Sequence, residues 1–512
     1  MYPSNNRLFK TILLASSLTL SAVSNAANIL QADQFLLDKN FAEAQKAYLV
    51  LSESGSAKAF YQLGKIHLEG LGVEQDMLKA VLWFDLAAEQ NFADAGQVVA
   101  DLLKLASPQT HENIIQLQAE FRAQQGWQRI KMRYFPVLKQ QTLASKIYFG
   151  NKTENQSVPQ YHQTASYNSQ VELNSIVPDK VKLTGPNPVL NQTQAEFLFG
   201  RLSKVDFFKQ AYSAIVDYDI AADGSVRNLQ VEQKIGYIHP KVWPGLKTFN
   251  TSKPQFNQET VAFINRSFIG LAGESEAYIR NQKEDIYAGL VRAARKLKQD
   301  PSIEGQFQYA MALTSFEWLA EDKDELEQLL TQLANAGHPL AQYELGFKLY
   351  REQKNIAQAI HWLGESAKAG VARAEYRLGH ILLNSPWVEK DETKALYWLE
   401  RAVEQSHIAS LLTASELKLL ADNETLHNVK TAQDYLTKVP EAQQDNPQYE
   451  FLQAMVNFKQ TPRKLDQAVN HIQKAIKLGE QLNWDVTDWQ AMLTDWTSGG
   501  KVSVTDQPLV KL

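Results

Sequence analysis

Apolar residues recur at helical spacing over most of the chain, and small residues recur with them in a fixed register. The segment AFYQLG at Ala59–Gly64 returns as AQYELG at Ala341–Gly346 and as AEYRLG at Ala374–Gly379. The last two copies start 33 residues apart (374 − 341). Self-similarity at a fixed period of this length is typical of repeat architectures, in which each repeat is one supersecondary unit. The pattern therefore predicts stacked copies of one helical unit.

Each copy fits a pair of antiparallel helices. Glycine inside a helix costs about 1 kcal/mol relative to alanine, so its return at the end of each motif predicts a place where a Cβ would clash. Gly70 and Gly72 tolerate positive φ and are expected to end the first helix. A single hairpin cannot bury its apolar face, whereas stacked hairpins can. An alanine and a tryptophan follow each copy, and we expect the tryptophans to pack between units: Ala80 and Trp83, Ala359 and Trp362, Ala395 and Trp398.

These residues resemble the Sel-one-like (Sel1) repeat family, a relative of the tetratricopeptide repeats. Residues 58–93 carry nearly the whole pattern, whereas residues 341–372 and 374–408 depart from it in the loop between the helices. The resemblance implies helix pairs that stack into a solenoid. The repeat-signature residues, to which we assign a structural role, are Ala59, Leu63, Gly64, Gly70, Gly72, Ala80, Trp83, Ala341, Leu345, Gly346, Ala359, Trp362, Ala374, Leu378, Gly379, Ala395 and Trp398.

Weaker tetratricopeptide-like units flank these copies, at Leu37–Tyr48 and Leu465–Ala475. The expected fold is therefore mostly α, an α-solenoid of antiparallel helical hairpins in two blocks with a small α+β insert between them. The expected domains are a signal peptide (1–26), N-terminal helical repeats (27–140), an irregular linker (141–200), a small α+β domain (201–272), a C-terminal helical repeat array (273–480), and a cap with a flexible tail (481–512).

The middle of the chain changes character. Residues 141–200 are rich in Asn, Gln, Ser and Pro and show no helical period, which predicts a linker or an irregular wrap. Residues 212–232 then alternate, with Ala214, Val216, Tyr218 and Ile220 on one face of a predicted strand. Asp223-Gly224 is a strong tight-turn signal, so a returning strand is expected after it. On this interpretation Asp217 and Asp219 lie on the solvent face of the strand.

A strand, an Asp-Gly turn, a strand, a short helix and the segment Lys253–Phe256 (KPQF) together resemble the TonB C-terminal domain over about residues 201–272. The chain departs from that family because it has no proline-rich spacer and no N-terminal membrane span, and Pro240 and Pro244 interrupt the expected helix. The resemblance implies the fold and a capacity to bind peptides by strand addition, and it does not imply energy transduction. The alternative is an unrelated small β-insert.

The N-terminus has the pattern of a secretory signal. Arg7 and Lys10 precede an apolar run at Thr11–Val23, and Ser24-Asn25-Ala26 supplies small residues for cleavage after Ala26. The alternative, an uncleaved membrane anchor, needs roughly 20 apolar residues, and the run has about 13. We therefore expect a periplasmic protein that does not span the membrane after cleavage.

Candidate chemistry is sparse. The formal charge is −5 and no Lys/Arg run is interleaved with aromatic residues, so no nucleic-acid partner is expected. The absence of cysteine excludes disulfides, thiolate metal sites and a cysteine nucleophile. His361 and His380 come closest to a metal-ligand pair, but a polar position on the repeat surface explains His361 better than a metal site does. Asp217, Asp219 and Asp223 lack the spacing of a calcium-binding EF-hand loop. We thus predict no catalytic residue, metal or cofactor.

The expected function is that of a periplasmic protein–protein interaction scaffold or adaptor without catalysis. Its partners would be other proteins or peptides of the cell envelope, lying along the inner helices of the solenoid. The alternatives are a TonB-family-like binding module that contacts outer-membrane transport components and, third, an enzyme such as a cell-wall hydrolase. Trp484, Trp489 and Trp496 either cap the array or form an adhesive surface, and the contact residues of a partner cannot be named from the pattern.

Overall fold

The computed structural model describes residues 28–150, 212–235, 238, 242–249 and 251–498. The predicted signal peptide, most of the predicted linker and the predicted flexible tail lie outside these residues. The described chain is mostly helical, which confirms the expected fold class. None of its helices is both long and apolar enough to cross a membrane.

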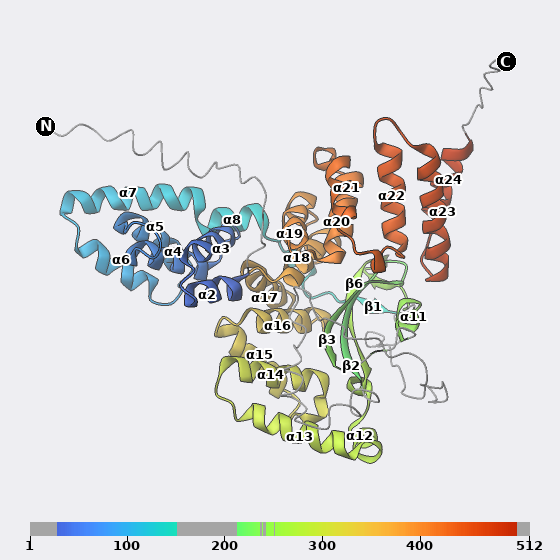
Figure 1. Cartoon of the computed structure of the whole chain (residues 1–512), viewed down its shortest axis with the longest axis horizontal. Coiled ribbons are helices and arrows are strands. Elements are labelled where there is room, and N and C mark those ends of the chain that lie inside the picture. The colour runs from blue at the N-terminus through green and yellow to red at the C-terminus, as the bar shows by residue number, and fades with distance from the viewer. Residues whose placement is uncertain (1–27, 151–211, 236–237, 239–241, 250, 499–512) are drawn as a thin grey trace, which may run out of the picture.

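The N-terminal array consists of consecutive helical hairpins that extend away from the rest of the molecule (Figure 1). Asp76 starts one helix of the best-matching hairpin, because its carboxylate accepts a hydrogen bond from the Lys79 amide at 3.0 Å. Gly70 ends the preceding helix with a φ of +68°. The helices are α2 (Ile29–Leu37), α3 (Phe41–Glu53), α4 (Ala57–Glu69), α5 (Met77–Glu89), α6 (Ala95–Lys104), α7 (Pro108–Gln125) and α8 (Trp127–Tyr134).

The C-terminal array follows directly after the central sheet and curves around it (Figure 1). Its helices are α12 (Glu276–Gln282), α13 (Glu284–Lys298), α14 (Ile303–Ser315), α15 (Glu325–Asn335), α16 (Pro339–Arg351), α17 (Ile356–Lys368), α18 (Ala372–Asn384), α19 (Glu392–Glu404), α20 (Ile408–Leu420), α21 (Val429–Thr437), α22 (Pro447–Lys459), α23 (Leu465–Gln481) and α24 (Thr487–Ser498). Within its repeats, α16 and α18 are inner helices that face the sheet, and α17 and α19 are outer helices.

The central sheet has three antiparallel strands in the order β3-β2-β6: β2 (Ser213–Ile220), β3 (Val226–Ile235) and β6 (Phe263–Gly270). The predicted hairpin is present, and Gly224 has a φ of +88° in its turn. A short helix, α11 (Val242–Lys247), follows β3. A second, smaller sheet joins β1 (Tyr148–Phe149), β4 (Pro254–Phe256) and β5 (Glu259–Thr260).

Residues 135–149, which we call the strap, lie along the C-terminal array. The Lys139 amide donates to the Trp387 carbonyl at 2.8 Å, and the Trp387 indole donates to the Ser145 carbonyl at 2.9 Å. Further on, the Gln353 side chain bonds both backbone groups of Ile147. The sequence predicted a linker or an irregular wrap from residue 141. Up to residue 150 the structure shows a segment that lies against the repeats and ends in strand β1.

The two arrays are docked against each other through the outer helices of the C-terminal array. The Ile29 amide donates to the Ala369 carbonyl at 2.9 Å, and the Lys368 ammonium group donates to the Gln90 side chain at 2.9 Å. The rings of Tyr134 and Tyr397 stack with their centroids 3.6 Å apart. The N-terminal array therefore adds to the convex side of the C-terminal array.

The glycines of the repeat motif lie where helices cross closely. A Cβ added to Gly379 would lie 2.7 Å from Leu399 Cγ, and one added to Gly64 would lie 2.8 Å from the Phe84 ring. Gly379→Ala is therefore expected to lower the free energy of unfolding by about 1–3 kcal/mol through overpacking. Circular dichroism melts would show a lower Tm. Gly96→Ala is the matched control, because its Cβ would meet only Ala88 at 4.0 Å. An unchanged Tm for Gly379→Ala would contradict the close crossing.

Candidate functional site: the inner face of the C-terminal array

The inner face of the C-terminal array is covered by the chain's own sheet. Arg377 on α18 donates to Asp219 on β2 at 2.5 Å, and Arg266 on β6 donates to Glu344 on α16 at 2.7 Å. A further ion pair joins Arg373 on α18 to Glu232 on β3. These contacts show that strands β2, β3 and β6 occupy the helices expected to receive a partner. The prediction that a partner lies along them is wrong for α16 and α18.

Asp217 and Asp219 are buried, with 0 % and 3 % of their surface exposed. The prediction that they face solvent is therefore wrong. Asp217 accepts two hydrogen bonds from the Arg266 guanidinium, at 2.5 and 2.9 Å, and one from the Tyr343 hydroxyl at 3.2 Å. The alternation along β2 predicted correctly which residues share a face of the strand. Both faces are covered, however, one by apolar residues and one by the charged inner helices.

Neighbouring groups favour the charged form of Asp219. Burial would raise the pKa of Asp219, but the adjacent His380 and Arg377 outweigh it, and the pKa of Asp219 lies below its ordinary value. Hydrogen bonds from Tyr376 and Asn228 act in the same direction. Burial alone would lower the pKa of Arg266, yet Asp217 and Glu344 raise it well above its usual value. Asp219 and Arg266 therefore both stay charged over the ordinary pH range.

The histidines singled out in the sequence do not form a site together. His380 lies on inner helix α18, buried, with Nε2 3.8 Å from Asp219 Oδ2. His361 lies on outer helix α17, and its side chain is 56 % exposed beside Glu365. Burial lowers the pKa of the His380 ring. Among the described residues, no group of three or more His, Cys, Asp or Glu side chains is placed to hold a metal ion.

The repeat tryptophans pack between elements. Trp398 is buried and its indole donates to the Tyr134 carbonyl at 2.7 Å, which ties the outer helix α19 to α8. Trp362 is buried as well, whereas Trp83 is half-buried between Phe60 and Phe121.

The tryptophans near the C-terminus cap the array. Trp489 and Trp496 stack on Phe451 and Phe458, with centroids 4.9 and 4.3 Å apart. Arg227 of the hairpin lies 4.1 Å above the Trp484 ring, and the Asp485 amide donates to Asp223 at 2.9 Å. The C-terminal end of the array therefore contacts the turn of the β2–β3 hairpin.

Sequence reasoning missed the charged residues of the interface. Glu344 and Arg377 occupy the same position of the repeat motif, and Tyr343 and Tyr376 occupy the position before it. A charge inside an otherwise apolar motif was the available signal. It could not identify the covering element, because Asp217 and Arg266 lie far away in the sequence.

Three segments of the chain match the Sel1 repeat family: residues 57–92, 339–371 and 372–407. They coincide with α4 and α5, α16 and α17, and α18 and α19. The chain therefore contains Sel1 repeats in both arrays. No curated protein matches the chain.

Three solved structures show limited similarity. A Sel1 repeat protein from Oxalobacter formigenes is 18 % identical, with a TM-score of 0.31 over 43 % of this chain and 67 % of its own. A protective antigen of uropathogenic Escherichia coli strains displaying an SLR fold is 15 % identical, with a TM-score of 0.32 over 91 % and 87 %. Yeast Tom70 is 13 % identical, with a TM-score of 0.26 over 89 % and 76 %. No functional conclusion rests on these three similarities.

Arg377→Met is expected to destabilise the protein strongly, because it leaves Asp219 buried without its cation. Removing one partner of a buried ion pair costs about 3–5 kcal/mol. The Tm should fall, and the double variant Asp219→Asn/Arg377→Met should recover part of the loss. Lys104→Met is the control, since it breaks the exposed pair with Asp101 and should leave the Tm unchanged. Equal melting of Arg377→Met and the parent would show that the pair is dispensable.

We expect the folded protein to lose stability in acid because of the buried His407. Burial, reinforced by Arg377, lowers the pKa of this ring to about 3, and an unfolded histidine titrates near 6.5. Between these values the unfolded chain binds the proton and the folded chain does not, so stability falls as pH drops from about 6.5 towards 3. His407→Asn keeps a side chain able to cap α20, as the ring does by accepting from the Ser410 amide. Its Tm should fall less steeply over this range, and an equal slope would exclude His407 as the cause.

Proposed function

We propose that this chain is a non-catalytic, periplasmic protein–protein interaction scaffold that uses its N-terminal Sel1 repeats to bind other envelope proteins. The C-terminal repeats serve a different purpose, because their inner face holds the chain's own sheet. Support for the division of roles comes from comparing the same motif positions in the two arrays. Export is supported by the signal pattern at the N-terminus.

The inner positions that are covered in the C-terminal array are open in the N-terminal array. Phe347 on α16 and His380 on α18 occupy the same repeat position, because each lies five residues after the second residue of its motif, Gln342 or Glu375. Both side chains are buried. The equivalent residue on α4 is Lys65, and its side chain is 46 % exposed. Among the described residues nothing covers this position. The difference between Lys65 and its buried counterparts is the observation that carries the proposal.

Exposed apolar side chains also concentrate in the N-terminal array. Of the twelve large hydrophobic side chains exposed among the described residues, seven belong to residues 28–134, although this segment is about a quarter of them. They are Leu30, Leu37, Leu49, Met77, Leu105, Ile115 and Met132. The N-terminal array thus presents more exposed large apolar side chains per residue than the rest of the described chain.

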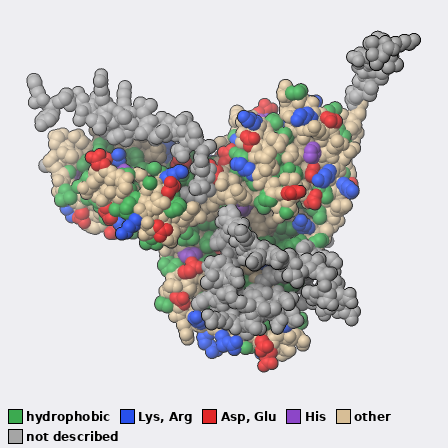
Figure 2. All heavy atoms as spheres, viewed as in Figure 1, with side chains coloured by type: hydrophobic (Ala, Val, Ile, Leu, Met, Phe, Trp, Pro, Cys, Tyr) green, Lys and Arg blue, Asp and Glu red, His purple; other side chains and the backbone are tan. Residues whose placement is uncertain are grey.

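Charge does not favour a nucleic-acid partner. On the face drawn in Figure 2, basic and acidic side chains are largely interspersed over both arrays. The formal charge of the chain is −5. On this face the described residues form no continuous basic stripe, which is the kind of surface on which phosphate contacts depend.

The competing proposal is a TonB-family-like module that contacts outer-membrane transport components through the sheet. Strands β3 and β6 are the edges of this sheet, and edge strands are able to accept an added strand. Burial of the Asp217 and Asp219 face against α16 and α18 favours an architectural role instead.

Crosslinking from the N-terminal array tests the proposal. A photoreactive residue at Tyr61 should capture envelope proteins in an osmotic-shock fraction, where the intact mass should show that residues 1–26 are missing. Lys65→Asp should weaken capture about tenfold, since it reverses an exposed charge on the inner face. Lys46→Asp, an equally exposed reversal on α3, is the control and should leave capture unchanged. A second photoreactive residue placed in β3 or β6 tests the alternative, and crosslinks that form only from there would favour the TonB-like module. A cytoplasmic, uncleaved chain would overturn export.

A further inference from the structure

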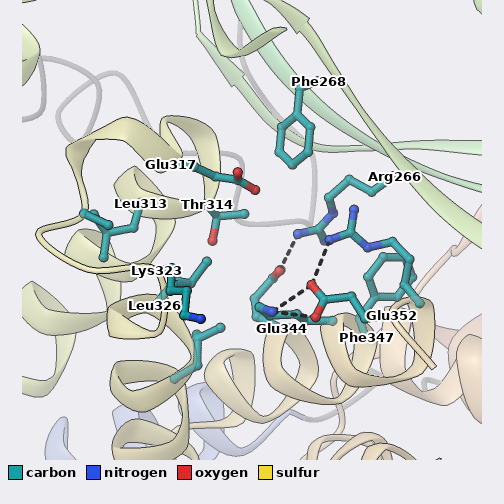
Figure 3. Close-up of a pocket in the computed structure, with 14 residues that line it drawn as sticks. Arg266, Phe268, Leu313, Thr314, Glu317, Lys323, Leu326, Glu344, Phe347 and Glu352 are labelled. Atoms are coloured by element: carbon teal, nitrogen blue, oxygen red, sulfur yellow. Dashed lines mark hydrogen bonds and ion pairs between the residues drawn. The ribbon is translucent and has the colours of Figure 1, made fainter. Parts of the chain in front are cut away.

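A cavity of about 280 Å³ lies between the central sheet and the first helices of the C-terminal array. Strand β6 forms one wall, and helices α14, α15 and α16 form the others (Figure 3). Phe268, Leu313, Leu326 and Phe347 give it an apolar lining. In Figure 3, Glu317 and Lys323 lie on the side of α14 and α15, and Arg266 and Phe268 lie across from them.

Most charges around this cavity are already paired. Arg266 bonds both Asp217 and Glu344, and Lys348 bonds Glu352 at 2.7 Å. Lys354 adds a second cation to Glu352, at 2.9 Å. These groups therefore need no ligand to satisfy them.

Arg351 is the exception. Its side chain is 15 % exposed, and its guanidinium makes no hydrogen bond to any described residue. Its nearest carboxylate oxygen is on Glu352, 3.8 Å from Nη2, and that carboxylate is held by two lysines. Burial, with Arg266 nearby, lowers the pKa of Arg351. A largely buried guanidinium with five donors and no acceptor is costly unless a partner supplies the acceptor.

We propose that this cavity binds a small carboxylate-bearing ligand with an apolar body, and that Arg351 holds the carboxylate. The planar guanidinium matches two carboxylate oxygens in a bidentate pair. The apolar body would contact Phe268, Leu326 and Leu330.

The incompletely paired cation of the cavity is Arg351. Among the described lining residues, it reaches a carboxylate only at 3.8 Å, on Glu352, whereas the exposed Lys323 and Glu317 carry opposite charges that offset each other. One such guanidinium matches one carboxylate group. The carboxylate belongs either to a free small acid or to the C-terminus of a peptide, since both present the same group.

Binding should be measured by calorimetry on the mature chain with three probes. N-acetyl-leucine represents the free acid, N-acetyl-leucinamide lacks the carboxylate, and a tripeptide ending in leucine represents a peptide C-terminus. The acid or the tripeptide should bind at least tenfold more tightly than the amide, and the stronger of the two identifies the source. Equal binding of amide and acid, or no binding of any probe, would overturn the proposal.

Variants separate this role from a structural one. Arg351→Met should abolish the preference for the carboxylate and raise the Tm, because it removes an unpaired buried cation. A structural arginine would instead lower the Tm when removed, and that result would count against the site. Lys323→Glu, at an exposed lining position, should weaken acid binding severalfold while the protein stays folded. Arg280→Gln, an exposed change on α12, is the control that should alter neither property.

Discussion

The buried ion pairs between β2, β6 and the inner helices hold the structure together. A carboxylate such as Asp219 cannot be buried alone, and its cation, Arg377, belongs to a repeat more than 150 residues away in the sequence. Arg266 likewise needs both Asp217 from its own sheet and Glu344 from α16. Neither the sheet nor the array can therefore bury its polar face without the other, and the sheet acts as the axis around which the C-terminal repeats curve.

This constraint explains why the same repeat type has a covered inner face in one array and an exposed one in the other. In the C-terminal array the inner positions carry Glu344 and Arg377, which match charges on the sheet. In the N-terminal array Gln62 occupies that position, and Lys65 one turn further on is exposed. The N-terminal array contacts the outer helices α17 and α19 instead, so its own inner face stays available. The different surroundings of the two inner faces follow from a few substitutions on the same helix face.

The sheet does not fill the inner face completely. Beyond Arg266 the strand β6 runs past α14 and α16 without closing the space between them, and the cavity beside Arg351 remains. At the opposite end, Trp484 and Asp485 close the array on the hairpin tip through Arg227 and Asp223. The array therefore has a cavity with a buried arginine beside its first helices, and a closed contact with the hairpin at its C-terminal end.

The sequence by itself determined the local elements. The register of Gly64, Gly346 and Gly379 predicted the helix pairs because a close helix crossing excludes a Cβ, and Asp223-Gly224 predicted the hairpin because its turn needs positive φ. The sequence could not determine what covers each face. Alternation along β2 separates Asp217 and Asp219 from the apolar residues, but their burial depends on cations supplied by distant helices. Only the tertiary structure decided that the inner face of the C-terminal array binds its own sheet, because long-range charge pairing leaves no periodic signal along the chain.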